Sequence, residues 1–222
     1  MIVLYGFLPS GNVYKVRLLF SHLRIAYRRV EVAQTAGHTS LPAFRRINFI
    51  GKVPVVKLVD GRFLTESGAI LYYFSQGTDF WPTDLRAQTE TLRWMFFEQY
   101  SHEPPIAGNR YLLRYSEARV GIEKTLEANA TRGEHALFVM DAHLARSSWF
   151  SGGRYGIADI ALYAYTHIAE EGGFKLSTYT NISRWLDRVR SQPDHISLLQ
   201  EDSAWPVTSL EEEALGWEGN AP

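Results

Sequence analysis

The sequence predicts an α/β domain followed by an all-helical domain, and two observations support this division. Short apolar runs alternate with helical periodicity as far as residue 77, whereas only helical periodicity is found from residue 87 to about residue 200. A segment containing Phe80-Trp81-Pro82 separates the two regions. The expected parts are a first domain at 1–77, a linker at 78–86, a helical domain at 87–205, and a loosely ordered, acidic tail at 206–222.

The first domain begins with a strand-helix-strand pattern. Residues 2–5 form a short apolar run that indicates a buried strand, and residues 13–23 carry apolar side chains at helical spacing. Residues 27–32 are rich in β-forming side chains and indicate a second strand. Such a unit places its two strands parallel, with a right-handed crossover.

A hairpin and a helix are expected to complete this domain. Residues 33–48 suggest one or two helical turns, and residues 53–59 indicate a strand. Asp60-Gly61 is a two-residue hairpin signal that would pair residues 62–64 with that strand. Ser67 is placed to cap a helix that stops near Gly77. The order β-α-β-α-β-β-α is that of a thioredoxin-like domain.

The second domain is predicted as a bundle of helices. A first helix leads into Pro104-Pro105, which should kink or break it. A long helix follows through residues 126–144, and residues 182–189 indicate another. Residues 157–169 are apolar on most faces, which is typical of a buried central helix.

Composition narrows the classes of function. The chain has 222 residues, of which 45% are hydrophobic and 21% charged, with a net charge of −1, so we expect a globular protein that binds neither nucleic acid nor membrane. No basic segment precedes the first apolar run, so we expect no secretory signal and a cytoplasmic location. There is no cysteine. Any thiol chemistry must therefore use the thiol of a ligand, and we expect no metal site.

Ser10 is the first candidate for chemistry. It lies between the first strand and the first helix, where sheets of this kind place their ligands. Its hydroxyl, with the N–H groups at the start of the helix, could hold an incoming thiol as the thiolate. The alternative, which local sequence alone favours, is that Ser10 only caps the helix.

Two dipeptides form the other candidates. Val53-Pro54 precedes a strand, and a cis bond there would present the backbone of Val53 to an extended peptide, although most X-Pro bonds are trans. Glu66-Ser67 offers an anion beside a helix N-terminus, as the head group of an α-amino acid requires. On local grounds, a helix cap with an acid in its first turn is the favoured explanation of that pair.

Together, these features resemble the glutathione transferase family. The resemblance covers roughly residues 1 to 200 and is carried by four segments in this order: Leu4 to Arg17, Asn48 to Val55, Leu64 to Ile70, and Gly156-Ile157-Ala158-Asp159-Ile160-Ala161. One departure is Gly156, where the family usually has a Ser or Thr cap, and it leaves the robustness of folding open.

The resemblance implies a glutathione site. The activating residue would be Ser10 or, as a second candidate, Asn12. The backbone of Val53, before a cis-Pro54, would pair with the cysteinyl part of glutathione. The remaining contacts would be made by Glu66 and Ser67 to the γ-glutamyl end, and by Lys52 and His38 to the glycine carboxylate.

An acceptor pocket would lie between the domains. Its expected residues are aromatic and polar: Tyr100, His102, Arg110, Tyr111 and Tyr165. His102 or Arg110 is a candidate residue for assisting the electrophilic substrate during the reaction. An aromatic stripe at helical spacing is more often part of a core, which is the competing interpretation.

Three functions stay open. The leading one is a homodimeric, detoxifying transferase that joins glutathione to small, mostly apolar electrophiles. The second is a glutathione-dependent disulfide reductase, which the lack of cysteine permits. The third is a non-catalytic glutathione-binding module. The sequence does not identify the natural acceptor.

Overall fold

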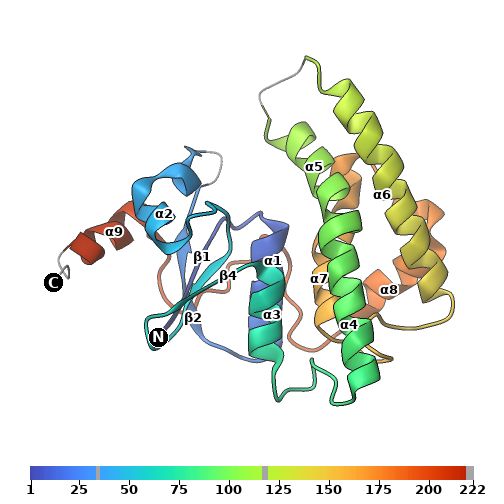
Figure 1. Ribbon diagram of the computed structural model, residues 1–222, viewed down its shortest axis with the longest axis horizontal. Coiled ribbons are helices and arrows are strands. Elements are labelled where there is room, and N and C mark those ends of the chain that lie inside the picture. The colour runs from blue at the N-terminus through green and yellow to red at the C-terminus, as the bar shows by residue number, and fades with distance from the viewer. Residues whose placement is uncertain (34–35, 117–119, 219–222) are drawn as a thin grey trace. The chain divides into compact units, whose positions relative to one another are not determined.

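The computed structural model describes residues 1–33, 36–116 and 120–218, which fold as two compact units. Unit 1 comprises Met1–Phe74 and Ile196–Pro222, and unit 2 comprises Ser75–His195. The C-terminal helix, red in Figure 1, therefore belongs with the blue N-terminal elements rather than with the helical unit.

Unit 1 is built on a five-stranded sheet of order β4-β3-β1-β2-β5. Strand β1 (Ile2–Gly6) pairs in parallel with β2 (Tyr27–Glu31) across helix α1 (Gly11–His22), as the β-α-β pattern predicted. After η2 (His38–Ser40) and α2 (Pro42–Ile47), β3 (Val55–Lys57) and β4 (Phe63–Thr65) add antiparallel strands. Helix α3 (Ser67–Ser75) follows, which confirms the thioredoxin-like order.

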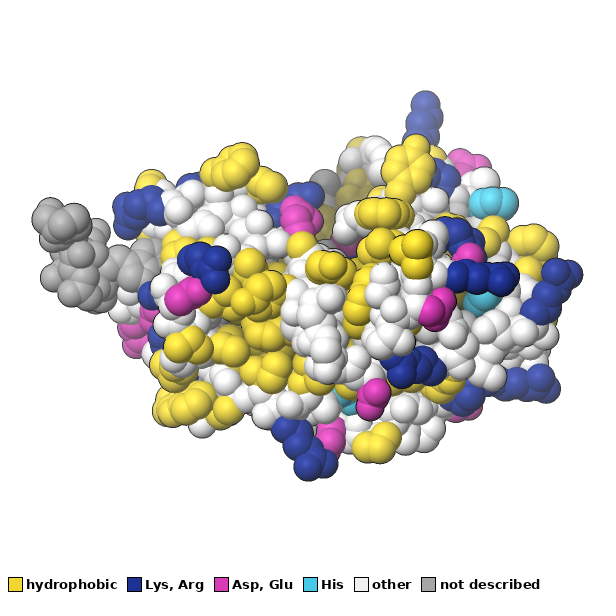
Figure 2. Space-filling model, turned by 60° about the horizontal axis from the view of Figure 1, so that its bottom comes forward, with side chains coloured by type: hydrophobic (Ala, Val, Ile, Leu, Met, Phe, Trp, Pro, Cys, Tyr) yellow, Lys and Arg dark blue, Asp and Glu magenta, His cyan; other side chains and the backbone are white. Residues whose placement is uncertain are grey.

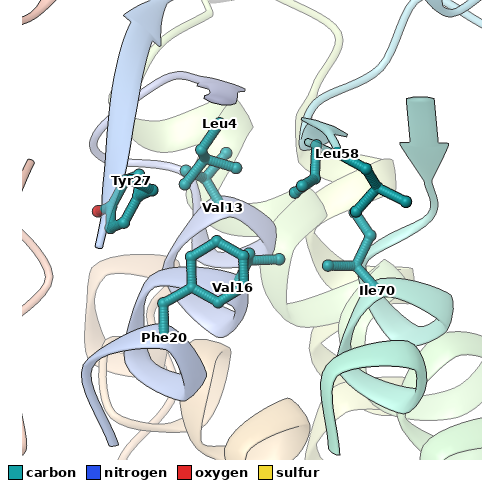
Figure 3. Close-up of a cluster of buried hydrophobic side chains, with 8 residues drawn as sticks. Leu4, Val13, Val16, Phe20, Tyr27, Leu58 and Ile70 are labelled. Carbon is teal, nitrogen blue, oxygen red and sulfur yellow. The ribbon is translucent and has the colours of Figure 1, made fainter. Parts of the chain in front are cut away.

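One core of unit 1 lies between the sheet and helices α1 and α3 (Figure 3). Leu4 of β1, Phe20 of α1 and Ile70 of α3 are each 0% exposed within it. Gly6 is required where β1 meets α1, because a Cβ there would lie 2.6 Å from a methyl carbon of Val13. This close approach brings the end of β1 directly over the first turn of α1.

The C-terminal segment corrects the expectation of a loose tail. Strand β5 (Thr208–Ser209) pairs in parallel with β2, and helix α9 (Leu210–Glu218) follows it. Leu210 is 1% exposed and packs in a second core cluster of unit 1. The physical reason is that β2 would otherwise be an edge strand with unpaired backbone groups. Residues 219–222 of the expected tail lie outside the described residues.

Buried polar contacts fix this segment to unit 1. Arg17 is 0% exposed, donates from Nε to Asp202 Oδ1 at 2.8 Å, and reaches the carbonyl of Leu198 at 2.7 Å. The hydroxyl of Tyr14 donates to the carbonyl of Ile196 at 2.6 Å. Residues 196–205 were expected in the helical domain, but these contacts hold them on unit 1 instead.

The acidic helix α9 has its own partners. Glu213 accepts from the hydroxyl of Tyr5 at 3.0 Å and pairs with Arg28 at 2.7 Å. Burial, and then the Glu213 carboxylate, raise the pKa of the Tyr5 hydroxyl above its usual range. The acidic side chains had suggested a solvated tail, but Glu213 instead holds α9 on the sheet of unit 1.

Unit 2 is all helical, as predicted. Its long helices are α4 (Leu85–Phe97), α5 (Glu103–Arg114), α6 (Glu123–Leu144), α7 (Ile157–Thr166) and α8 (Thr180–Arg190). A π-helical segment, η3 (Glu98–His102), joins α4 to α5 just before Pro104-Pro105, so these prolines lie in a first helical turn. Every residue of α7 is buried, which confirms the central helix.

The helical pattern ends earlier than expected. Helix α8 stops at Arg190, and the described residues between it and β5 contain no helix. Within residues 1–33, 36–116 and 120–218, no helix is long and apolar enough to cross a membrane.

Candidate functional site

Ser10 is the N-cap of α1, as its local sequence indicated. Its backbone is extended, and its Oγ accepts from the N–H of Val13 at 3.4 Å, a long hydrogen bond. In the described part of the chain, no acceptor is recorded for the Ser10 hydroxyl proton. The hydroxyl can therefore cap the helix and also donate to an anion in front of it.

Asn12 and Ser67 link the starts of α1 and α3. Ser67 is 5% exposed, and its hydroxyl donates to Asn12 Oδ1 at 3.2 Å. The expectation that Ser67 caps α3 is wrong, because the first helical hydrogen bond runs from Ile70 N–H to the carbonyl of Glu66. Ser67 thus lies in the first turn, and its side chain reaches across to α1.

Glu66 has a backbone that few non-glycine residues adopt. Its φ is 68°, in the left-handed region, and its side chain is exposed directly before α3. Strained residues of this kind concentrate at ligand sites. This is a structural reason, beyond sequence pattern, to place a ligand at Glu66.

The Val53-Pro54 bond is cis. Pro54 is buried, and Val53 is partly buried just before β3. Among the described residues, no hydrogen bond is recorded for the backbone N–H or C=O of Val53. These groups are therefore suited to pair with an extended ligand.

His38 lies beside α9, which was not expected. Its Nδ1 accepts from the N–H of Ala33 at 3.3 Å, so the ring proton belongs on Nε2, which is 3.3 Å from Glu211 Oε1. Lys52 is exposed, and its carbonyl accepts from Asn48 Nδ2 at 2.7 Å. Of the two side chains expected to meet the glycine carboxylate of glutathione, His38 therefore already faces a carboxylate of this chain.

The five acceptor-pocket candidates of unit 2 divide into two groups. His102 is 0% exposed with Nε2 2.9 Å from Thr166 Oγ1, and Arg110 is 6% exposed and pairs with Glu171 at 2.8 Å. These contacts within unit 2 disfavour the hypothesis that either residue helps an electrophile. The other candidates are Tyr165, which is buried, and Tyr100 and Tyr111, which are exposed.

Two family models match this chain. The N-terminal domain of glutathione S-transferase matches residues 1–76, and the C-terminal domain matches residues 104–193. The chain belongs to the glutathione S-transferase family. Since this glutathione S-transferase family member has no cysteine, it cannot supply a protein thiol.

Three similar proteins illustrate its place in the family. A glutathione S-transferase crystal structure from Pseudomonas fluorescens is 43% identical, with a TM-score of 0.87 over 90% of this chain and 99% of that chain. Disulfide-bond oxidoreductase YfcG of Escherichia coli is 30% identical over 200 residues, which are 87% of this chain and 92% of the relative. A Pseudomonas putida glutathione transferase with glutathione disulfide bound is 21% identical, has a TM-score of 0.76 over 87% of this chain and 88% of that chain, and shares the fold.

Proposed function

We propose that this protein is a glutathione transferase that joins glutathione to small electrophiles, with a detoxifying role in the cytoplasm. The observation that carries the proposal is the Ser10 hydroxyl, placed at the start of α1 in a chain that has no cysteine. A donor at a helix N-terminus lowers the pKa of a bound thiol and holds the thiolate. The reacting sulfur would then belong to glutathione.

We propose a partner in unit 1 for each part of glutathione. In the proposal, the γ-glutamyl ammonium group pairs with Glu66 and its carboxylate meets Ser67, next to Asn12. The cysteinyl backbone pairs with Val53 before cis-Pro54. Lys52 is the stronger candidate for the glycine carboxylate, because His38 faces Glu211.

The proposed reaction needs only a thiolate and an acceptor. The sulfur electron pair forms a bond to an electrophilic carbon, and either a leaving anion departs or the adduct takes up a proton. Ser10 stabilises the thiolate before attack, and unit 2 contributes the acceptor side, where exposed Tyr100 and Tyr111 stay candidates. Binding energy from both ends of glutathione positions the sulfur.

A second candidate function is reduction of disulfides. The 30% identity to Disulfide-bond oxidoreductase YfcG favours it. The glutathione thiolate would attack a disulfide sulfur, the other sulfur would leave as a thiolate, and a second glutathione would complete the exchange. No protein cysteine is needed for either step.

One experiment compares the two functions and the two activating residues. Wild type, Ser10→Ala, Asn12→Ala and the exposed control Ser40→Ala are assayed with a chloronitrobenzene and with hydroxyethyl disulfide. Loss of one oxyanion donor typically lowers kcat by about 100-fold or more, so we expect this for Ser10→Ala on the chloronitrobenzene, with little change in the Kd for glutathione.

Normal turnover of Ser10→Ala with an inactive Asn12→Ala would assign activation to Asn12. Higher activity on the disulfide would favour the reductase.

A non-catalytic module is the third candidate. It would bind glutathione and turn over neither substrate. Absence of glutathione binding at about millimolar concentration would remove both enzymatic proposals and leave an interaction module.

We also propose a homodimer. Figure 2 shows hydrophobic side chains gathered on one face of unit 1, and a hollow of about 360 Å³ in that unit is lined partly by Val59 and Tyr73. On α4 of unit 2, Leu85 and Phe96 are 78% and 70% exposed. Exposed apolar surfaces of this kind are typical of subunit contacts. Light scattering after size-exclusion chromatography should give twice the chain mass of 25.3 kDa, and a monomer would contradict the proposal.

A further inference from the structure

A polar hollow on unit 2 lies outside the candidate glutathione site. It has a volume of about 250 Å³ and forms where the end of α6 and the following loop meet α8. Its lining residues are mostly polar or basic: Leu144, Ala145, Arg146, Ser147, Ser148, Asn181, Arg184 and Arg188. No carboxylate is among them.

Two of its three arginines have no recorded counter-charge. Arg146 and Arg184 are exposed, and within the described ranges neither side chain has a hydrogen bond or ion pair. By contrast, Arg190 on the same helix α8 pairs with Asp187 at 2.8 Å. The like charges of Arg184 and Arg188 stand four residues apart, a spacing that weakens a helix unless an anion compensates.

The third guanidinium is held in place. Arg188 donates to the carbonyl of Ser148 at 3.0 Å, and its guanidinium carbon lies 5.6 Å from the centre of the Trp149 ring. Its Nε atom is buried without a hydrogen-bond partner among the described residues. A fixed guanidinium loses less conformational entropy when it binds a ligand, so this side chain is preorganised.

The neighbouring acid does not neutralise the hollow. Asp141 of α6 accepts from the N–H groups of Asn181 and Ile182 at 2.9 and 3.0 Å, and so caps the start of α8. Its carboxylate is thus committed to the backbone and to the Asn181 amide. The arginine cluster keeps its positive charge towards solvent.

We propose that this hollow binds a phosphate group, either as inorganic phosphate or on a small phosphomonoester. Guanidinium groups match phosphate oxygens through paired N–H donors, and three of them suit a doubly charged tetrahedral anion. The Ser148 hydroxyl adds a donor at the rim. A volume of about 250 Å³ accommodates a phosphate with a small organic group, but is below the range typical of larger ligands.

Calorimetric titration of the full chain tests the proposal. Inorganic phosphate and glycerol phosphate are titrated separately, in chloride buffer of constant ionic strength, so that general salt effects cancel. The variants are Arg146→Gln, Arg146→Gln/Arg184→Gln, and the control Arg86→Gln/Arg132→Gln. The control removes the same two charges from exposed positions of unit 2 outside the hollow.

We expect one phosphate per chain in wild type and in the control. The affinity should fall about tenfold or more in the double variant and by an intermediate factor in Arg146→Gln. Tighter binding of glycerol phosphate would identify a phosphomonoester, whereas equal binding would identify the free anion. The proposal is overturned if wild type binds neither probe up to about 10 mM, or if the control loses as much affinity as the double variant. Because Arg146 is exposed, its single variant keeps the test decisive should the double variant fold poorly.

Discussion

Ser151 provides the helix cap that Gly156 lacks. Its Oγ accepts from the N–H of Ala158 in the first turn of α7 at 3.1 Å. A Cβ at Gly156 would lie 2.7 Å from the Cβ of Ser151 and 2.8 Å from its Oγ. The serine from the preceding loop therefore occupies the space of an ordinary N-cap side chain, and glycine is needed to admit it. The departure from the family pattern is compensated by this contact.

Restoring the usual cap should therefore destabilise the protein. N-cap preference alone predicts that Gly156→Ser gains a few tenths of a kcal/mol. Because the new Cβ would also lie 2.9 Å from the carbonyl of Phe80, we expect a loss of about 1–3 kcal/mol from overpacking. Denaturant unfolding measures the difference.

The matched double variant identifies the cause. Ser151→Gly alone should cost about 1 kcal/mol, because the buried N–H of Ala158 loses its acceptor. In Ser151→Gly/Gly156→Ser the new hydroxyl can cap α7 from its own position, so the double variant should be more stable than the sum of the single losses by about 1 kcal/mol. Additive losses would show that the two residues do not share one role.

The buried Arg17 should control the docking of the C-terminal segment. Arg17→Met keeps an apolar stem but leaves Asp202 and two carbonyls without their donor. We expect a loss of about 3 kcal/mol in unfolding free energy, together with faster protease cleavage after residue 195. Arg46→Met, at an exposed position of α2, is the control and should change neither. Unchanged cleavage in Arg17→Met would mean that β5 and α9 hold the segment alone.

Glu211 should weaken glutathione binding if His38 meets the glycine carboxylate. The two carboxylates would then compete for one imidazole 3.3 Å from Glu211. Removing one like charge at an exposed site is worth up to about 1 kcal/mol, so Glu211→Gln should lower the KM for glutathione by about two- to fivefold with kcat unchanged. Glu212→Gln carries the same charge change on α9, but its carboxylate accepts from Ser209 N–H. An equal shift in both variants would indicate long-range charge, and no shift would remove His38 from the site.

Periodicity predicted the fold where partners are close in sequence. The β1-α1-β2 unit and the hairpin of β3 and β4 follow from local spacing and turn chemistry, and both are present. The turn is one residue longer than the expected Asp60-Gly61 pair, because the N–H of Leu58 bonds to the carbonyl of Arg62 and leaves residues 59–61 between the strands. The two-residue strand β5 has no such pattern. Its place depends on contacts such as Arg17 with Asp202, which are 185 residues apart. Contacts between residues so far apart in the sequence leave no local pattern from which they could be predicted.

The candidate site likewise has features that the sequence predicts and features that it does not. Helix starts can be located from the sequence, so Ser10 and Ser67 were placed at the beginning of α1 and α3. The bond from Ser67 to Asn12 and the approach of Glu211 to His38 could not be predicted, because both depend on side-chain directions across separate elements. The burial of His102 could not be predicted for the same reason, because it depends on packing beside Thr166 of α7.

His167 should make the protein less stable in mild acid. Burial lowers the pKa of His167 from 6.5 to about 4, and the nearby Arg190 contributes in the same direction. Its ring stacks on Tyr163 with centroids 4.6 Å apart. Below pH 6.5 the unfolded chain binds a proton at this position, which the folded chain does not bind until about pH 4. Stability from the neutral ring is therefore full above pH 6.5 and is lost as the pH falls towards 4, by roughly 2 kcal/mol between pH 7 and 5.

The variant His167→Phe separates this effect from the titration of other groups. Phenylalanine keeps a ring beside Tyr163 and cannot take up a proton, although it loses the contact of Nδ1 with the Tyr163 carbonyl at 2.8 Å. We expect the variant to be less stable than wild type at pH 7 and to close most of that gap by pH 5, because only in wild type does protonation of residue 167 stabilise the unfolded chain. The measurement is the difference in unfolding free energy at the two pH values. A difference that does not change with pH would show that the pKa of His167 is the same in the folded and unfolded chain.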